Sequence, residues 1–142
     1  MDDPVEIVLV EDNADDAELT LRALKKHNLA NSVHIIHDGA AALEYLLPDG
    51  TGGDRSSPRL ILLDLKLPKV SGLEVLQRLK GDDRTKAIPV VVLTSSQEEQ
   101  DLIESYRLGT NSYIVKPVDF DDFTRAVAEI GLYWMLLNKI PV

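Results

Sequence analysis

The chain of 142 residues contains no cysteine, so a disulfide framework is excluded. Absence of disulfides fits a reducing compartment. The sequence also has no apolar run approaching the roughly 20 residues that a membrane-spanning helix needs. Residues 1–4 are acidic and lack the basic-then-apolar layout of a secretory signal. We therefore expect a protein of the cytoplasm that does not enter the membrane.

Basic residues are scarce. The sequence has 15 Lys and Arg against 24 Asp and Glu, which gives a formal net charge of −9 at pH 7. Binding to a phosphate backbone depends on Lys and Arg neutralising phosphates, so this surface would repel nucleic acid on balance. We expect no nucleic-acid partner.

Apolar runs rich in β-branched residues alternate with helical patterns along the whole chain. Strands are predicted over 5–10, 32–37, 59–64, 89–93 and 112–115. Helices are predicted over about 14–28, 39–47, 72–80, 97–108 and 119–138. Such alternation is typical of βαβ units with right-handed crossovers. The runs at 59–64 and 89–93 are almost continuously apolar, which favours parallel strands buried on both faces.

The sequence predicts a single α/β domain over 1–142 with no output domain attached. The segment 48–58, rich in Gly, Ser and Asp, is interpreted as a surface loop and not as a linker. The fold class is a doubly wound, five-stranded parallel sheet, for which we take the flavodoxin-like strand order 2-1-3-4-5. Ligands bind such sheets outside the carboxyl ends of the strands, where the strand order reverses. In this order the reversal lies between the first and third strands.

Acidic residues follow both of those strands. Glu11 and Asp12 end the first, and Asp64 ends the third. Carboxylates gathered at one sheet edge raise each other's pKa, and burial adds to the effect. The arrangement is therefore unfavourable unless a cation occupies it, and Mg2+ prefers such oxygen ligands. The sequence predicts a Mg2+ site here.

Two further polar residues follow strands, namely Thr94 after 89–93 and Lys116, with Pro117, after 112–115. Taken singly, each has an ordinary explanation, since a strand-ending Asp is more often a helix cap and such a Lys a solvated side chain. The joint pattern is more specific, because an acidic pair, Asp, Thr and Lys-Pro each come at the end of their own strand.

At these residues the chain resembles the receiver domains of bacterial two-component response regulators. Within that family it is similar to the stand-alone regulators paired with phytochrome histidine kinases. The resemblance covers nearly the whole chain and rests on residues 9–13, 63–68, Ser71-Gly72, 93–96 and 113–117. The long loop at 48–58, residues 108–113 and the tail from 118 to 134 suggest the phytochrome subgroup.

The resemblance implies a role for each position. Asp64 would be the phosphoacceptor. Asp12 would bind Mg2+ directly and Glu11 through water, together with Asp64 and the backbone carbonyl of Lys66. Lys116 would lie against the phosphoryl oxygens. The remaining roles are the switch pair Thr94 and Tyr113 and the structural residues Pro68, Gly72 and Pro117, the last with a cis peptide bond.

Lys66 departs from the polar residue that the family often carries two positions after the phosphoacceptor. Its side chain could reach over the site or point into solvent, and Ser96 could affect the attacking water. His34 and His37 lie three apart on a strand and so face opposite ways, which makes them a poor metal pair. His27 is interpreted as a helix-end residue.

The predicted last helix carries an apolar stripe with additional apolar residues beside it. One interpretation is a homodimer interface at this end of the chain, and the alternative is a thicker core. The stripe comprises Phe120, Phe123, Val127, Ile130, Trp134 and Leu137, and the additional residues are Leu132, Tyr133, Met135 and Leu136.

The sequence therefore predicts a phosphoacceptor signalling module and not a turnover enzyme. Its partner would be a sensor histidine kinase, and the resemblance implies one of the phytochrome type. A haloacid-dehalogenase-type phosphatase would need a second Asp where Lys66 stands. A nucleotide- or flavin-binding protein would want a Gly-rich first turn, whereas residues 11–16 are acidic. A degenerate receiver acting as a scaffold is disfavoured because every chemical position is filled.

Overall fold

The computed structural model describes residues 7–26, 32–47, 58–95, 99–116 and 121. Several sequence predictions fall wholly or partly outside these residues. They concern the loop over 48–57, Ser96, Pro117 with its cis bond, His27, and the helix over 119–138 apart from residue 121.

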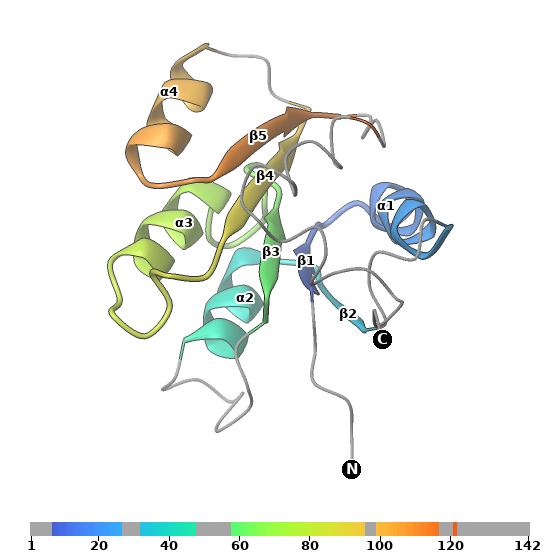
Figure 1. Ribbon diagram of the computed structural model, residues 1–142, viewed down its shortest axis with the longest axis horizontal. Coiled ribbons are helices and arrows are strands. Elements are labelled where there is room, and N and C mark those ends of the chain that lie inside the picture. Colours follow the sequence, from blue (N-terminus) through green and yellow to red (C-terminus); the bar gives the residue numbers. More distant parts are fainter. Residues whose placement is uncertain (1–6, 27–31, 48–57, 96–98, 117–120, 122–142) are drawn as a thin grey trace, which may run out of the picture.

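One parallel sheet organises the fold, and its strand order is β2-β1-β3-β4-β5, as predicted. Figure 1 shows β5 at one edge and β2 at the other, with β1 and β3 between them. The elements, in chain order, are β1 Ile7–Val10, α1 Ala14–Lys26, β2 Val33–Ile36, α2 Gly39–Leu46, β3 Leu60–Leu63, α3 Gly72–Lys80, β4 Val90–Thr94, α4 Glu99–Arg107 and β5 Ser112–Val115.

For the elements that the structure describes, the predicted boundaries hold to within one or two residues. The helix over 72–80 and the strand over 112–115 match α3 and β5. One difference concerns Thr94, which was expected after its strand but forms the last residue of β4. Thr94 pairs with Val115, and its carbonyl accepts a 2.8 Å hydrogen bond from the Lys116 N–H. This extra bond continues the ladder by one residue.

Alternation along the strands divides the core between the two faces of the sheet. Val8 and Val10 of β1 and Ile61 and Leu63 of β3 share one cluster with the apolar side chains of α2 and α3. Figure 1 shows α2 and α3 on one side of the sheet and α1 on the other. Both faces of the central strands are fully buried, which explains their continuous apolar sequence.

Helix starts are fixed by side-chain caps. The Asn13 Oδ1 accepts a 3.0 Å hydrogen bond from the Asp16 N–H, so Asn13 caps α1. Ser71 caps α3 by accepting from the Glu74 N–H at 3.2 Å, and Asp38 caps α2 by accepting from the Ala41 N–H at 2.7 Å. These caps set the points at which each helix leaves the carboxyl edge of the sheet.

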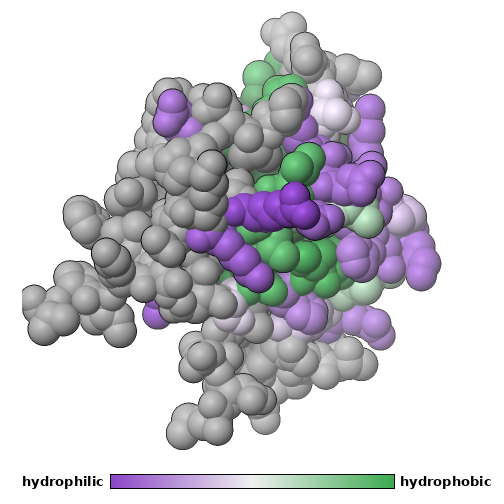
Figure 2. Space-filling view, turned by 90° about the vertical axis from the view of Figure 1, so that its right-hand side faces the viewer, coloured by the Kyte–Doolittle hydropathy of each residue, from purple (hydrophilic) through white to green (hydrophobic). Residues whose placement is uncertain are grey.

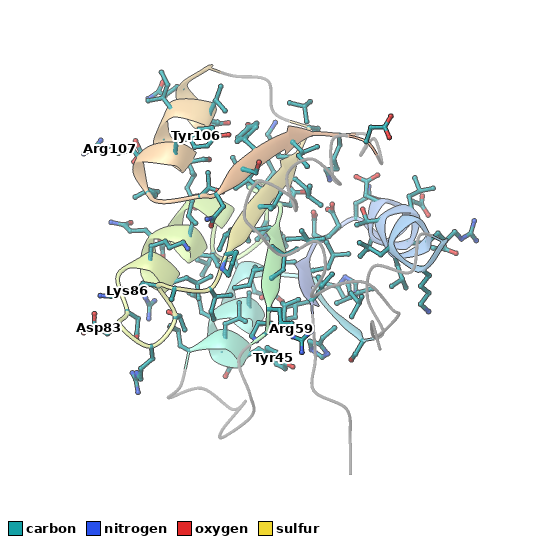
Figure 3. All side chains as sticks on the ribbon, in the orientation of Figure 1. Tyr45, Arg59, Asp83, Lys86, Tyr106 and Arg107 are labelled. Carbon is teal, nitrogen blue, oxygen red and sulfur yellow. The ribbon has the colours of Figure 1, made fainter. Side chains whose placement is uncertain are left out.

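The helices α4 and α1 present apolar residues to solvent. Leu102, Ile103 and Tyr106 of α4 are exposed, and Figure 3 shows Tyr106 and Arg107 at the outer end of that helix. Leu19 of α1 is exposed as well. Figure 2, which views the molecule from the right-hand side of Figure 1, shows hydrophobic residues near the centre of that face, with hydrophilic ones across and around them. None of the helices in the described part of the chain combines the length and apolar character needed to cross a membrane.

Candidate functional site

Three strand ends bring Glu11, Asp64 and Lys116 together. Glu11 follows β1, Asp64 follows β3 and Lys116 follows β5, so all lie at the carboxyl edge of the sheet. The Lys116 Nζ lies 2.5 Å from Glu11 Oε1 and 2.9 Å from Asp64 Oδ2. These side chains are almost fully buried, with exposed fractions of 11% for Lys116, 3% for Glu11 and 7% for Asp64. A buried ammonium group thus neutralises the acids that the sequence had placed at this edge.

A fourth residue, Asp16, joins the cluster from the first turn of α1. Its Oδ2 lies 2.9 Å from the Lys116 Nζ, and its side chain is 39% exposed. An ammonium group has three hydrogens, and here each has its own carboxylate acceptor, in Glu11, Asp16 and Asp64. The position of Lys116 is therefore fixed from three directions.

The backbone around Asp64 holds its carboxylate in place. The Asp64 N–H donates to the Val10 carbonyl at 3.0 Å and so continues the pairing of β3 with β1. The Lys66 N–H donates to Asp64 Oδ1 at 3.0 Å. A Cβ on Gly72 would overlap the Asp64 carbonyl oxygen and the Leu65 Cα, so glycine is required for α3 to start this close. The predicted structural role of Gly72 thus has a local physical reason.

Glu11 is held by its own backbone and by the neighbouring loop. Its N–H donates to the Ile36 carbonyl at 2.9 Å, and its Oε2 accepts from the Asn13 N–H at 3.3 Å. The Glu11 carbonyl lies 3.0 Å from the His37 Nδ1. His37 therefore contacts the backbone of the site, whereas His34 stacks on Tyr45 with ring centroids 4.4 Å apart.

Burial and mutual contacts separate the pKa values of the two acids. Burial raises the pKa of Glu11 to about 7; the Lys116 hydrogen bond opposes this rise and the Asp64 carboxyl adds to it. Burial also pushes the pKa of Asp64 upward, but hydrogen bonds with Glu11, Lys116 and the Lys66 N–H outweigh it, and the pKa falls below its ordinary 3.8. Glu11 therefore holds a proton more readily than Asp64, and Asp64 is the acid of this pair that favours the ionised form.

Lys116 remains charged in this environment. Burial lowers the pKa of its ammonium group, but the hydrogen bonds to Glu11, Asp16 and Asp64 raise it by more, and the net shift is upward from 10.5. The site therefore keeps a permanent cation beside the Asp64 carboxylate at every physiological pH.

The donor set fits a divalent cation. Glu11, Asp12 and Asp64 each offer a carboxylate oxygen, and these oxygens lie within 4.8 Å of one another. Opposite ligand oxygens on one Mg2+ lie about 4.2 Å apart, since each Mg–O bond is about 2.1 Å. Small side-chain rotations would therefore close the cluster around the ion. Asp12 is exposed, which leaves a side of the site open to water, and Mg2+ usually keeps several water ligands.

The other predicted residues lie on β4, on β5 and in the loop after β3. Thr94 is fully buried at the end of β4, next to the strand that carries Asp64. Tyr113 is half-buried on β5, and the Lys66 residue is exposed. The Pro68 carbonyl accepts hydrogen bonds from Gly39 at 3.2 Å and Val70 at 2.8 Å, which ties the loop after β3 to the start of α2.

Sequence reasoning missed Asp16, because its place depends on how α1 is rotated about its axis. The buried residues Ala17, Thr20 and Leu24 mark the inward side of this helix. Asp16 lies one turn before Thr20 on that side, whereas Asp15 lies one turn before the exposed Leu19. Of the two adjacent acids, the helix thus directs Asp16 toward the sheet edge.

The comparison with protein families agrees with this geometry. A family model described as the response regulator receiver domain matches residues 7–128. The chain belongs to the response regulator receiver domain family.

Relatives of this receiver domain match along its whole length. It is 47% identical to the probable methanogenesis regulatory protein FilR2 of Methanothrix harundinacea, over 99% of this chain and 90% of that protein. The structure of the bacteriophytochrome response regulator AtBRR is 53% identical, has a TM-score of 0.83, and is matched over 97% of this chain and all of the other.

A third relative bears on the metal. The Mn(2+)-bound form of the response regulator Rcp1 is 40% identical to this receiver domain, with a TM-score of 0.77, and is matched over 98% of this chain and all of the other. The curated Rcp1 protein comes from Synechocystis. A divalent cation in that relative agrees with the acidic cluster of Glu11, Asp12 and Asp64 in this one.

Proposed function

We propose that this receiver domain accepts a phosphoryl group on Asp64 from the phosphohistidine of a sensor histidine kinase, in a reaction that requires Mg2+. The observation that carries the proposal is the Asp64 carboxylate, which is ionised, lies among candidate Mg2+ ligands, and has the Lys116 Nζ at 2.9 Å. Transfer of the anionic phosphoryl group requires a nucleophile with a fixed cation close to it, and Asp64 and Lys116 provide this pair.

The chemistry is a displacement at phosphorus. An Asp64 carboxylate oxygen forms the new O–P bond, the P–N bond of phosphohistidine breaks, and its electron pair stays on the ring nitrogen. Bound Mg2+ would supply neutralisation of the charge on the transferring phosphoryl oxygens. Its ligands would be Asp12 and Asp64 directly, Glu11 through water, and the backbone carbonyl of Lys66. Lys116 would donate to a phosphoryl oxygen.

Thr94 and Tyr113 would convert the new charge into a change of surface. A phosphoryl group adds up to about −2 charge and strong acceptor oxygens at one position. The Thr94 hydroxyl would bond one of these oxygens from the end of β4, and Tyr113 would change rotamer on the adjacent β5. The expected result is altered binding of another protein near α4 and β5.

The partner kinase is proposed to be of the phytochrome type, because bacteriophytochrome and cyanobacterial regulators match the whole chain. We further propose that the protein works in the cytoplasm, without a nucleic-acid partner or catalytic turnover. Its last helix would form a homodimer interface, supported by the apolar surplus in its sequence. An unchanged monomer in sedimentation, with and without phosphorylation, would rule the homodimer out.

The decisive test is intact-mass measurement after incubation with acetyl phosphate, with and without Mg2+. We expect a single phosphoryl adduct that requires both Mg2+ and Asp64, and that is absent in Asp64→Asn. Asp83→Asn, which changes an exposed acid of an i,i+3 ion pair on the loop after α3, is the matched control and should be labelled normally.

Two results would contradict the proposal. No adduct under conditions that label another receiver, together with no binding of beryllofluoride, would indicate a scaffold. Release of many phosphates per protein from a phosphomonoester would indicate a phosphatase, despite the lysine at position 66.

A further inference from the structure

Asp16 stands out because it contacts Lys116 without belonging to the acids that could hold a metal. Its Oδ2 lies 2.9 Å from the Lys116 Nζ. The three residues whose carboxylate oxygens come within 4.8 Å of one another are Glu11, Asp12 and Asp64. Lys116 thus shares two acids with the candidate metal site and has a third acceptor in Asp16.

The start of α1 holds Asp16 toward the site. The Asn13 side chain caps the helix by accepting a 3.0 Å hydrogen bond from the Asp16 backbone N–H. Asp16 then lies on the inward side of the helix, one turn before the buried Thr20. The neighbouring Asp15 is exposed on the other side and is a natural comparison, because it carries the same charge on the same turn.

We propose that Asp16 is a positioning residue for Lys116. It would hold the ammonium group on the α1 side of the site while Glu11 and Asp64 turn their oxygens toward a metal ion and a phosphoryl group. This inference rests on the proposed function, since it concerns how the same site exchanges partners. Asp16 itself touches neither metal nor phosphoryl group.

The role of Asp16 follows from the number of carboxylates that accept hydrogen bonds from the Lys116 ammonium group. A carboxylate oxygen bonded to the ammonium group must give up or share that bond to ligate a metal. With Asp16 present, Lys116 keeps one charged acceptor throughout. Without it, all acid partners of Lys116 found in this structure would be residues the metal also uses. Loss of Asp16 should therefore weaken metal binding by more than loss of one nearby charge.

The test is a double-mutant cycle measured by Mg2+ titration, followed through backbone amide NMR signals. We expect Asp16→Asn to raise the Mg2+ Kd about fivefold, within the range of measured couplings between contacting charges. Asp15→Asn should raise it by less than about twofold. In a Lys116→Met background, Asp16→Asn should act no more strongly than Asp15→Asn does. Asp16→Glu should recover most of the wild-type affinity.

A second readout follows the ammonium group directly. In the Mg2+-loaded protein, the 15N signal of Lys116 should shift in Asp16→Asn and stay in place in Asp15→Asn. Equal effects of the two substitutions on the Kd, or an Asp16→Asn effect that persists without Lys116, would overturn the inference while leaving the proposed function intact. A wild-type protein that neither binds Mg2+ nor takes up a phosphoryl group would instead overturn the proposed function, and the inference with it.

Discussion

Lys116 serves in this structure as the counter-ion of acids that would otherwise repel one another. Its ammonium group occupies oxygens of Glu11 and Asp64, which are also candidate metal ligands. A lysine in that position both competes with a metal ion for those oxygens and supplies the charge that an incoming phosphoryl group requires. Removing the lysine side chain should therefore have opposite effects on metal binding and on phosphoryl uptake.

Lys116→Met should therefore tighten Mg2+ binding and slow phosphoryl uptake in the same protein. The metal gains because a competing cation is gone, and phosphoryl transfer loses a fixed donor. The measurements are a Mg2+ titration and the rate of labelling by acetyl phosphate at saturating Mg2+. Lys66→Met is the control, since it removes the same charge from an exposed residue two positions from Asp64. Equal changes in Mg2+ affinity and labelling rate for the two variants would show that a nearby positive charge is sufficient and that the contacts of Lys116 are not needed.

The sequence could predict those site residues whose position is determined by the end of a strand. Glu11, Asp12, Asp64 and Lys116 follow their strands directly, so sheet topology alone brings them together. Asp16 depends instead on the rotation of a helix about its axis. That rotation becomes visible only once Ala17 and Thr20 are known to be buried.

Among the elements, α3 begins directly against the backbone of Asp64. Its first residue, Gly72, donates its N–H to the Leu65 carbonyl at 2.9 Å and leaves no space for a side chain against the Asp64 backbone. At the other end of the helix, Gly81 has φ −87° and ψ −7°, a conformation open to any residue. The same helix thus begins and ends with glycines of different importance.

Gly72→Ala should destabilise the protein by about 1–3 kcal/mol, since the added methyl group can be accommodated only by a backbone shift. That shift would move Asp64, so labelling by acetyl phosphate should slow as well. Gly81→Ala should change the free energy of unfolding by less than about 1 kcal/mol and leave labelling unaffected. Urea unfolding and the labelling assay measure both quantities. An unchanged free energy of unfolding in Gly72→Ala would mean that the backbone of the loop after β3 can shift at little energetic cost.

Sequence periodicity predicted which segments are helices and which are strands. Some of the residues at which they end are determined instead by hydrogen bonds to a neighbouring strand. The helical pattern over 72–80 was enough to predict α3, and the structure adds its cap, Ser71. The last residue of β4 was not predictable in that way, because Thr94 extends the strand through its bond with the Lys116 N–H. A boundary set by a residue 22 positions away along the chain leaves no local trace in the sequence.

At the scale of the whole molecule, the formal net charge of −9 acts on every ion that approaches. The field favours cations and opposes anions. The screening length shortens from about 30 Å at 0.01 M salt to about 10 Å at 0.1 M. Salt should therefore affect the metal ion and the phosphoryl donor in opposite directions.

Raising NaCl over that range should weaken Mg2+ binding but accelerate labelling by the dianionic acetyl phosphate, provided Mg2+ is kept saturating at each salt concentration. The Kd comes from NMR titration and the rate from intact mass. A labelling rate that falls with salt at saturating Mg2+ would show that the local charge of Lys116 outweighs the overall field.

The overall architecture was predictable because buried strands and short connections leave few alternatives. The near-continuous apolar runs required a sheet covered on both faces, and the structure has that sheet in the expected order. The order itself came from resemblance to a known fold, since hydrophobic pattern alone does not distinguish which strands are neighbours.

The ion pairs of Lys116 join residues separated by 105, 100 and 52 positions along the chain. Contacts of such high sequence separation require long loops to close, and the entropic cost of that closure must be met before the contact can stabilise the fold. During synthesis, Glu11 and Asp64 leave the ribosome well before the segment that carries their counter-ion. The acids therefore acquire their cation only when β5 adds to the edge of the sheet, and competence for signalling arises together with the completed fold.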